Sequence, residues 1–167
     1  DEKKIKGKEP ISVPELQSEN VLRLPCFEGD LGPGFDPIAL GAEDYGLFPG
    51  LVQLSRDLDV VPDAAQYWEI LDNGRKYRFH LRDDVFWSDG RRVTAADFVY
   101  AWYRMLDPQG GMEVASLFYD IAGAADFHQG QGSKEDVRIN ALDERTLEIE
   151  LNYPTAYFIQ LLCHHVA

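Results

Sequence analysis

The clearest pattern in the chain is a strict alternation of apolar and polar side chains over residues 76–81, which read Lys-Tyr-Arg-Phe-His-Leu. A period of two is typical of a strand with one buried face. The preceding Asp72-Asn73-Gly74 separates this segment from a second extended segment at residues 67–71. Asn-Gly is the strongest short-range signal for a hairpin. We therefore predict an antiparallel β-hairpin over residues 67–81.

A capped helix is predicted shortly after the hairpin. Thr94 and Asp97 have the spacing of a capping box, and apolar residues then recur at helical spacing as far as Leu106. Asp107-Pro108 ends the helix. Between hairpin and helix, residues 86–90 read Phe-Trp-Ser-Asp-Gly, and Asp-Gly favours a tight turn. We expect the two rings before this turn to pack into a core rather than to bind a ligand.

The remaining patterns are weaker but complete the fold class. We expect a strand at 21–24, a helix within 42–53, a turn region at 58–63, a helix at 112–122, strands at 137–139 and 146–151, and a last helix that starts at Pro154. These elements predict an α+β fold with a small antiparallel sheet, mainly from residues 67–81 and 137–151. Helices near 95–106, 112–122 and 155–163 would cover one side of it.

The segment from Tyr77 to Pro108 carries a family resemblance. It contains R-x-x-V-x-W-S-D-G, then V-T-A-x-D-F-V-Y-A-W, then L-D-P. This ordered run resembles the signature region of the family 5 extracellular solute-binding proteins, the oligopeptide- and dipeptide-binding components of ABC importers. The resemblance implies a two-lobed, periplasmic-binding-protein-like fold of class II. In that family, the segment is a fold signature and not a ligand contact.

The resemblance also divides the chain into parts. Residues 1–19 are charged, contain two prolines and read as a linker. By the family's map, residues 20–40 are the first strand and loop of the large lobe, 41–160 are a small α+β domain, and 161–167 return to the large lobe. This map implies that the chain is about a third of a full family member and lacks the second lobe.

Three ligand-binding positions follow from the resemblance. Glu43 lies after the Phe35-Asp36-Pro37 segment, which resembles the family's cleft-lining x-D-P element. Val114 stands where peptide binders of the family have a tyrosine, and this is a departure from their pattern. His164 ends a Leu-Leu-Cys-His sequence that resembles the family's return crossing, where the histidine can line the cleft.

Charge and motifs exclude several function classes. Acidic residues outnumber basic ones by 29 to 16, which gives a formal net charge of -13 and disfavours nucleic acid or an anionic membrane surface as a partner. No hydrolase, zinc-protease or phosphate-loop motif occurs. The carboxylate pairs at 57/59, 83/84 and 143/144 lie in predicted turns. His80, His128 and adjacent His164 and His165 lack metal-ligand spacing. We therefore predict no enzyme, no metal and no cofactor.

The two cysteines allow two interpretations. Cys26 and Cys163 could form one disulfide in an oxidising compartment or be two buried thiols, and we favour the second. No apolar run is long enough for a membrane span. Since the chain has no signal peptide and does not begin with Met, we expect its natural N-terminus, with a possible lipid anchor, to lie upstream.

The leading hypothesis is a binding module without catalysis. It would be the N-terminal part of a periplasmic or extracellular receptor that closes around a peptide or similar small solute and delivers it to the membrane subunits of an ABC importer. The alternative is a ligand-sensing domain of the same fold in a larger regulatory protein. The charged linker at 1–19 is compatible with either.

Overall fold

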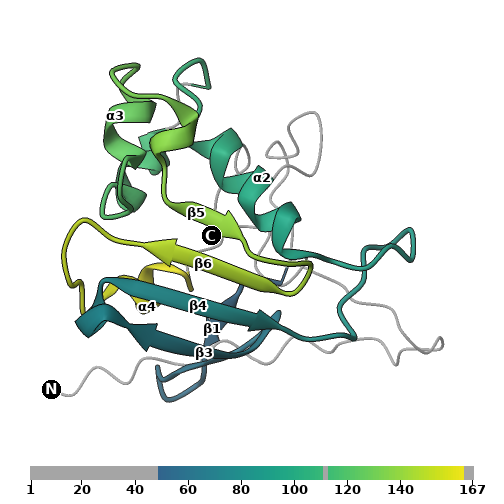
Figure 1. Cartoon of the computed structure of the whole chain (residues 1–167). Helices are drawn as coiled ribbons and strands as arrows, with labels where there is room; N and C mark the ends of the chain where they lie inside the picture. The colour runs from purple at the N-terminus through teal and green to yellow at the C-terminus, as the bar shows by residue number, and fades with distance from the viewer. Residues whose placement is uncertain (1–48, 111–112, 164–167) are drawn as a thin grey trace, which may run out of the picture. The chain divides into compact units, whose positions relative to one another are not determined.

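A four-stranded antiparallel sheet is the centre of the described part of the chain. The computed structural model describes residues 49–110 and 113–163 of the chain. Within these ranges, neighbouring strands of the main sheet follow the order β3-β4-β6-β5 (Figure 1). Their bounds are β3 Ala65–Leu71, β4 Lys76–Leu81, β6 Thr146–Glu150 and β5 Ile139–Ala141. The α+β class with a small antiparallel sheet is confirmed, although β5 begins two residues later than predicted.

The predicted hairpin is present as β3 and β4. Its turn is the short 3-10 segment η2 (Asp72–Gly74), and Leu71 pairs with Lys76 across it. Asn73 has φ 54° and Gly74 has φ 92°, so both occupy the left-handed region. Asparagine and glycine tolerate this conformation best, which is why the Asn-Gly sequence turns the chain here.

One face of the sheet is apolar and is covered by helices. The alternate residues of β4, Tyr77, Phe79 and Leu81, are buried, as are Leu147 and Ile149 of β6. The helix α2 (Ala95–Met105) packs along β5 and β6, and α4 (Phe158–Leu161) passes behind the sheet in the same view (Figure 1). The predicted alternation thus marks the face that meets the helices.

The α2 helix begins as its sequence predicts. The carboxylate of Asp97 accepts hydrogen bonds from the N–H and the hydroxyl of Thr94, each at 2.8 Å. Trp102, 1% exposed, lies on the buried side of the helix with its ring centroid 6.1 Å from that of Phe118. The cap therefore sets where the helix starts, and the apolar stripe sets which side faces the sheet.

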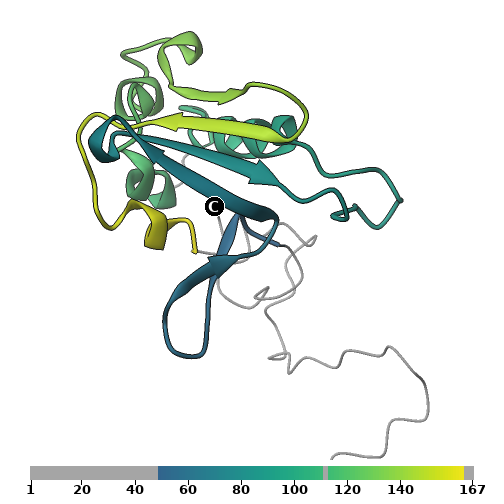
Figure 2. The same ribbon diagram turned by 60° about the horizontal axis from the view of Figure 1, so that its bottom comes forward.

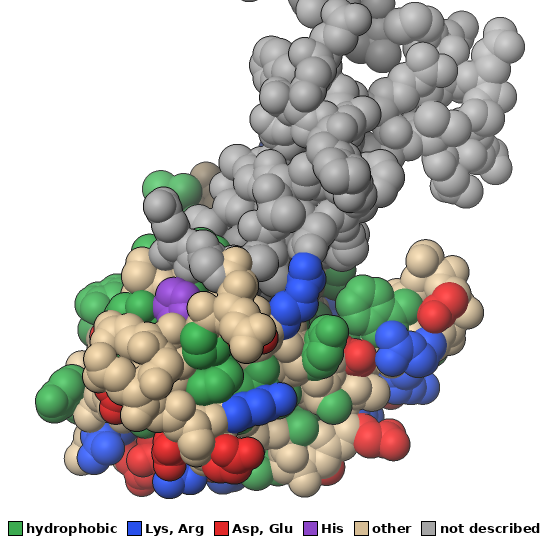
Figure 3. Space-filling model, turned by 90° about the horizontal axis from the view of Figure 1, so that it is seen from above, with side chains coloured by type: hydrophobic (Ala, Val, Ile, Leu, Met, Phe, Trp, Pro, Cys, Tyr) green, Lys and Arg blue, Asp and Glu red, His purple; other side chains and the backbone are tan. Residues whose placement is uncertain are grey.

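The other face of the sheet is charged. Arg78 lies between two acids on neighbouring strands, with Nη2 2.7 Å from Glu148 and Nη1 3.7 Å from Glu69. Lys76 adds a contact of 3.5 Å to Glu148. Acidic and basic side chains are interleaved along this side of the molecule, at the lower edge of Figure 3. Cross-strand pairs of opposite charge stabilise a solvated sheet face.

The segment before the main sheet differs from the prediction. The described part of the expected helix at 42–53 is extended, because β1 (Val52–Leu54) pairs antiparallel with β2 (Val60–Pro62). The expected turn region at 58–63 thus contains a strand. Valines favour a strand, and Val52 is only 2% exposed in the core. Burial of Val52 in the core therefore outweighs the weak helical spacing of residues 42–53, and this segment forms a strand.

The expected helix at 112–122 is also corrected. The chain forms the 3-10 helix η3 (Glu113–Phe118) and then a separate short helix, α3 (Ala124–His128). Between them, Ala122 N–H donates to the carbonyl of Glu150 at 2.9 Å and bonds this segment to the end of β6. Gly123, with φ 79°, redirects the chain into α3. A continuous helix over 112–122 could not form this hydrogen bond to the end of β6.

The last described helix is shorter than expected. α4 is one turn long and starts four residues after Pro154, which lies outside it. The carbonyl of Thr155 accepts the Tyr77 hydroxyl at 3.2 Å, so the chain before α4 is fixed to the sheet in a non-helical conformation. Another 3-10 segment, η4 (Lys134–Asp136), precedes β5. The predicted strand at 21–24 and the end of the return crossing at 164–167 lie outside the described residues.

Candidate functional site

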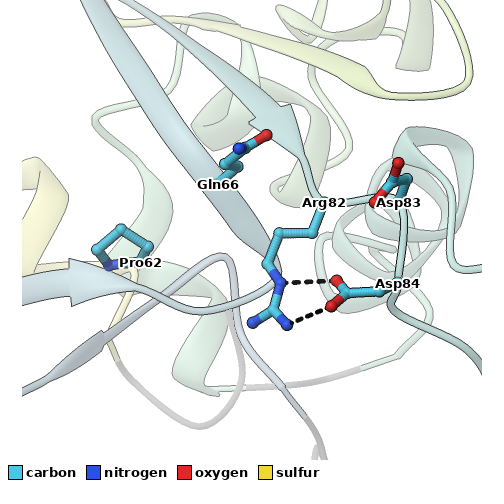
Figure 4. Close-up of a pocket in the computed structure, with 5 residues that line it drawn as sticks. All are labelled: Pro62, Gln66, Arg82, Asp83 and Asp84. Atoms are coloured by element: carbon cyan, nitrogen blue, oxygen red, sulfur yellow. Dashed lines mark hydrogen bonds and ion pairs between the residues drawn. The ribbon is translucent and has the colours of Figure 1, made fainter.

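An open hollow of about 260 Å³ lies where β2 ends, β3 begins and β4 gives way to the following loop. It is lined by Pro62, Gln66, Arg82, Asp83 and Asp84. Figure 4 shows the guanidinium of Arg82 facing the carboxylate of Asp84, with one hydrogen bond from Nε and one from Nη2, both 2.8 Å long. A third nitrogen, Nη1, donates to the carbonyl of Asp63 at 3.4 Å.

Arg82, the one cation that lines this hollow, is already paired with a carboxylate. The hydrogen bonds from Arg82 lower the pKa of Asp84, which keeps this carboxyl ionised. Burial raises the pKa of Asp63, against the opposing effects of the Gly50 N–H and the Arg82 charge. The volume is below the roughly 300–1,000 Å³ of small-molecule pockets. The hollow is open, and its one lining cation is already paired. Its side chains are therefore better suited to stabilising the end of β4 than to binding a ligand.

The loop between β4 and α2 forms a protruding hairpin, which extends to the right in both Figure 1 and Figure 2. Trp87 N–H donates to the carbonyl of Arg91 at 2.8 Å, and Gly90 N–H donates to the carbonyl of Trp87 at 2.9 Å. The turn predicted at Asp89-Gly90 is therefore confirmed, with Gly90 at φ 85°.

The predicted burial of the two rings in this hairpin is wrong. Phe86 is 52% exposed and Trp87 is 37% exposed. Each ring lies under a guanidinium, with Arg92 5.1 Å from the Phe86 centroid and Arg91 5.7 Å from that of Trp87. The turn carries the rings away from the sheet, and cation–π contacts cover them instead of a core. The two arginines directly after the Asp-Gly turn could have predicted that the rings are exposed, because a hairpin places these arginines opposite the rings.

Of the three predicted ligand-binding positions, only Val114 lies within the described residues. Val114 lies in η3, where it is half-buried and packs against the hydrophobic core. Its neighbours Ala115 and Phe118 are fully buried. Glu43 and His164 lie outside the described ranges. A ligand contact at Val114, Glu43 or His164 stays a prediction.

The histidines in the described part have ordinary structural partners. The His80 ring stacks on Tyr67 at 4.3 Å, and its Nε2 is 3.3 Å from Glu69, so it belongs to the charged sheet face. His128 Nδ1 is 2.7 Å from the hydroxyl of Tyr119. Among residues 49–110 and 113–163, no group of three His, Cys, Asp or Glu side chains is arranged to hold a metal ion.

Cys163 is a free, half-buried thiol. Its Sγ donates to the carbonyl of Ile159 at 3.7 Å, and burial raises the pKa of the thiol. A protonated, shielded thiol is a poor nucleophile. Cys26 lies outside the described residues, so only Cys163 can be assigned a state. Within the described ranges, no helix has the length and apolar character that crossing a bilayer requires.

Comparison with known proteins decides the family. The model for bacterial extracellular solute-binding proteins, family 5 Middle, matches residues 59–167. The chain belongs to this family. The dipeptide-binding protein DppE of Bacillus subtilis (strain 168) is 40% identical to it over 116 residues, which is 70% of this chain and 21% of the relative.

Two further proteins match a similar share of the chain. The probable deoxycholate-binding periplasmic protein YgiS of Escherichia coli (strain K12) is 38% identical over 130 residues, covering 72% of this chain and 24% of the relative. The solved structure of the pheromone receptor PrgZ superposes with a TM-score of 0.75 at 33% identity, covering 78% of this chain and 27% of that one. The matched part of the chain therefore covers about a fifth to a quarter of the length of these relatives.

Proposed function

We propose that this chain contributes a scaffolding domain to an extracytoplasmic receptor that captures peptides or a similar small solute. The receptor passes its ligand to the membrane subunits of an ABC importer, in the periplasm or outside the cell. Membership of family 5 supports this function. Relatives are named for binding dipeptides and, in one case, deoxycholate, so the proposal covers small solutes beyond peptides.

The single observation that carries the scaffolding role is the self-contained core beside a hollow whose one lining cation is already paired. The apolar face of the sheet is closed by the chain's own helices, with Phe79 and Trp102 at most 1% exposed. The Arg82 guanidinium is already paired with Asp84. The described residues thus form a stable support. The converging groups that bind the ligand have to come from other parts of the receptor.

The mechanism proposed is closure of two lobes around the ligand. A ligand that makes contacts only in the closed state shifts the population toward that state. The small domain would support one lobe through this motion. Its rigidity follows from the buried sheet face and from the charged ladder centred on Arg78.

A domain exchange tests the scaffolding role. Residues 49–163 would replace the matching segment of the Bacillus subtilis dipeptide-binding protein, with the unaltered protein as control. We expect the exchanged protein to bind dipeptides within about tenfold of the control affinity, which is a change of about 1.4 kcal/mol. A protein that keeps its melting temperature but loses dipeptide binding would show that this segment carries specificity.

Ligand capture itself is tested on the natural protein that contains this chain. After native purification, mass spectrometry of the denatured protein should release small peptides or another defined small solute. Release of no solute, together with no heat on titration of a peptide library, would contradict capture. The comparisons give no support to the alternative of a regulatory sensor.

A further inference from the structure

The turn that joins β3 to β4 contains a chemically labile pair of residues, Asn73-Gly74. Asn73 is exposed, and it is the one asparagine of the chain that is followed by glycine. Asparagine is among the residues that heat damages most readily in proteins. A following glycine has no Cβ to shield its backbone nitrogen from the asparagine side chain. The turn thus brings together the two groups that deamidation requires.

Deamidation at this pair needs only water and hydroxide from the solvent. Hydroxide removes the proton of the Gly74 N–H, and this nitrogen attacks Cγ of Asn73. The N–Cγ bond forms, the Cγ–Nδ2 bond breaks, and Nδ2 takes a proton from water and leaves as ammonia. Water then adds to one of the two carbonyl carbons of the five-membered ring and breaks its bond to the ring nitrogen. The products are aspartate, or isoaspartate, whose backbone runs through the side-chain carbonyl carbon.

The folded turn holds the two reacting groups apart. Asn73 has φ 54° and ψ 35°. In an L-residue, Cβ is rotated by about 120° from the backbone nitrogen around the Cα–C bond. At the observed ψ, the nitrogen of Gly74 therefore lies nearly opposite the Cβ of Asn73, whereas ring closure requires the two on the same side of the Cα–C bond. The five-membered ring cannot form while the turn keeps this conformation.

We propose that Asn73 is a site of spontaneous deamidation whose rate is controlled by opening of the β3–β4 turn. In the folded chain, the rate equals the rate of the unfolded chain multiplied by the fraction of molecules in which the turn is open. The modification therefore records how often this end of the hairpin opens. It depends on neither a ligand nor a partner, and it goes beyond the proposed role in solute capture.

The turn is strained, and few contacts close it. Asp72, Asn73 and Gly74 all have positive φ, at 49°, 54° and 92°. This conformation is unfavourable for residues other than glycine. Arg75 N–H donates to the carbonyl of Asp72 at 3.2 Å, and Lys76 Nζ is 3.8 Å from the Asp72 carboxylate. In the main sheet, β3 has only β4 beside it, so separation of a single strand pair opens the turn.

The two products should affect the hairpin differently. Aspartate tolerates the left-handed conformation, so it adds only a negative charge beside Asp72. Isoaspartate lengthens the backbone by one methylene group within a three-residue turn. Leu71 then no longer meets Lys76 directly across the turn, as it does in the intact hairpin. Since register in a hairpin is fixed by the turn, isoaspartate should weaken the pairing of β3 with β4.

Peptide mapping by mass spectrometry on the whole chain tests the proposal. The chain is incubated at mildly alkaline pH, folded in buffer and unfolded in about 6 M guanidinium chloride. In the unfolded chain, Asn73 should gain about 1 Da at least about tenfold faster than Asn140 or Asn152, which precede larger residues. In the folded chain, the gain at Asn73 should be at least about tenfold slower than in the unfolded chain.

Either of two results would overturn the proposal. Equal rates at Asn73 in the folded and unfolded chain would show that the turn does not control the reaction. A rate at Asn73 no higher than that at Asn140 in the unfolded chain would show that the pair is not labile. A free peptide of residues 68–79, incubated in both solvents, corrects for the effect of the denaturant on the chemistry.

A variant at the neighbouring residue separates turn opening from intrinsic reactivity. Asp72→Val places a β-branched side chain in the left-handed region and removes the contact to Lys76, so the turn should open more often. We expect the folded variant to deamidate at Asn73 at least about fivefold faster than the native chain, with unfolded rates equal within about twofold. Asp57→Val, at an exposed carboxylate in the β1–β2 turn, is the matched control and should not change the rate.

Circular dichroism would show that both variants are folded. A folded Asp72→Val chain that deamidates no faster than Asp57→Val would refute control by the turn. The comparison of the folded and unfolded native chain does not depend on either variant.

The isolated products test the predicted effect on the hairpin. The isoaspartate form, separated from aged protein by chromatography, should melt at a lower temperature than Asn73→Asp, which adds the charge without the extra backbone atom. Equal melting temperatures of these two forms would contradict the loss of strand pairing.

Discussion

Two phenylalanines seven positions apart show how little a residue type says about its environment. Phe79 is fully buried between the sheet and its helices, whereas Phe86 is 52% exposed on the protruding hairpin. Phe79 is in a strand whose alternation points it at the core. Phe86 follows the end of that strand, and its ring rests on Arg92 instead.

We therefore expect alanine at these positions to have opposite consequences. Phe79→Ala should reduce the free energy of unfolding by about 3–5 kcal/mol, because it opens a cavity in a closed core. Phe86→Ala should cost less than about 1 kcal/mol, since it removes a solvated cation–π contact. Urea unfolding of both variants measures the difference. Similar losses would mean that the hairpin is packed against something in solution.

The capping carboxylate of Asp97 links α2 to pH. Burial by itself would raise the pKa of Asp97, but hydrogen bonds from the N–H and hydroxyl of Thr94 and from Trp87, with the charge of Arg91, outweigh burial and lower the pKa. A carboxyl with a lowered pKa stabilises the fold when ionised. Its contribution is complete above the unfolded-state pKa of about 3.9 and is lost as the pH falls below that value.

We expect Asp97→Asn to lower the melting temperature at pH 7, by an amount that shrinks as the pH falls from about 5 to about 3. The amide cannot reproduce the charged cap, and protonation removes the same advantage from the native carboxyl. Asp57→Asn, at an exposed carboxylate in the β1–β2 turn, is the matched control. A constant difference between Asp97→Asn and the native chain over this range would show that the charge of Asp97 is not involved.

At the scale of elements, the β1–β2 turn contains a strained residue. Leu58 has φ 66° and is 75% exposed, so the left-handed conformation is not offset by burial of its side chain. Bonds within the turn hold it there, because Leu58 N–H donates to the carbonyl of Ser55 at 3.0 Å and Ser55 N–H to that of Asp59 at 2.8 Å. The left-handed region costs a branched residue about 1 kcal/mol.

Glycine at this turn should relieve the strain. We expect Leu58→Gly to raise the free energy of unfolding by about 0.5 kcal/mol, since relief of strain exceeds the added entropy of the unfolded chain.

Gly123→Ala, before α3, tests the converse. Gly123 has φ 79°, and a Cβ there would collide with the carbonyl of Asp136, so a loss of about 2–3 kcal/mol is expected. Thermal unfolding measures both, and a stabilising Gly123→Ala would contradict the close approach.

At the scale of the whole molecule, the sheet separates two kinds of interaction. The buried face supplies the core, whereas the opposite face holds the charged ladder of Glu69, Arg78 and Glu148. Burial opposes ionisation of Glu148, but Arg78 and Lys76 lower its pKa overall. The described part of the chain is thus stabilised by its own contacts, as a scaffolding domain requires.

A self-stabilised scaffold should not bind ligand alone. We expect the 167-residue chain to give no measurable heat when titrated with a mixed peptide library, because the hollow beside Arg82 is open and its cation is already paired. Calorimetry measures this, with the natural receptor as the positive control. Saturable micromolar binding by the chain alone would place a ligand site within it.

Local signals in the sequence are enough to predict the hairpin, the capped helix and the class of fold. Asn73 and Gly74 accept the left-handed conformation that the turn requires, and Thr94 with Asp97 fixes the start of α2. These signals depend on interactions between near neighbours in the chain, so they can be read locally. The family resemblance over 77–108 rested on the same segment and is confirmed by the match to residues 59–167.

Long-range packing, in contrast, fixes which apolar residues are buried and where the weakly predicted elements lie. Val52 and its neighbours become a strand because β2 pairs with them, and the predicted helix at 112–122 breaks because Ala122 bonds to the end of β6. Phe86 and Trp87 stay exposed because the turn after β4 leads away from the core. Each of these outcomes depends on a partner distant in the sequence, and such partners are set by packing rather than by local pattern.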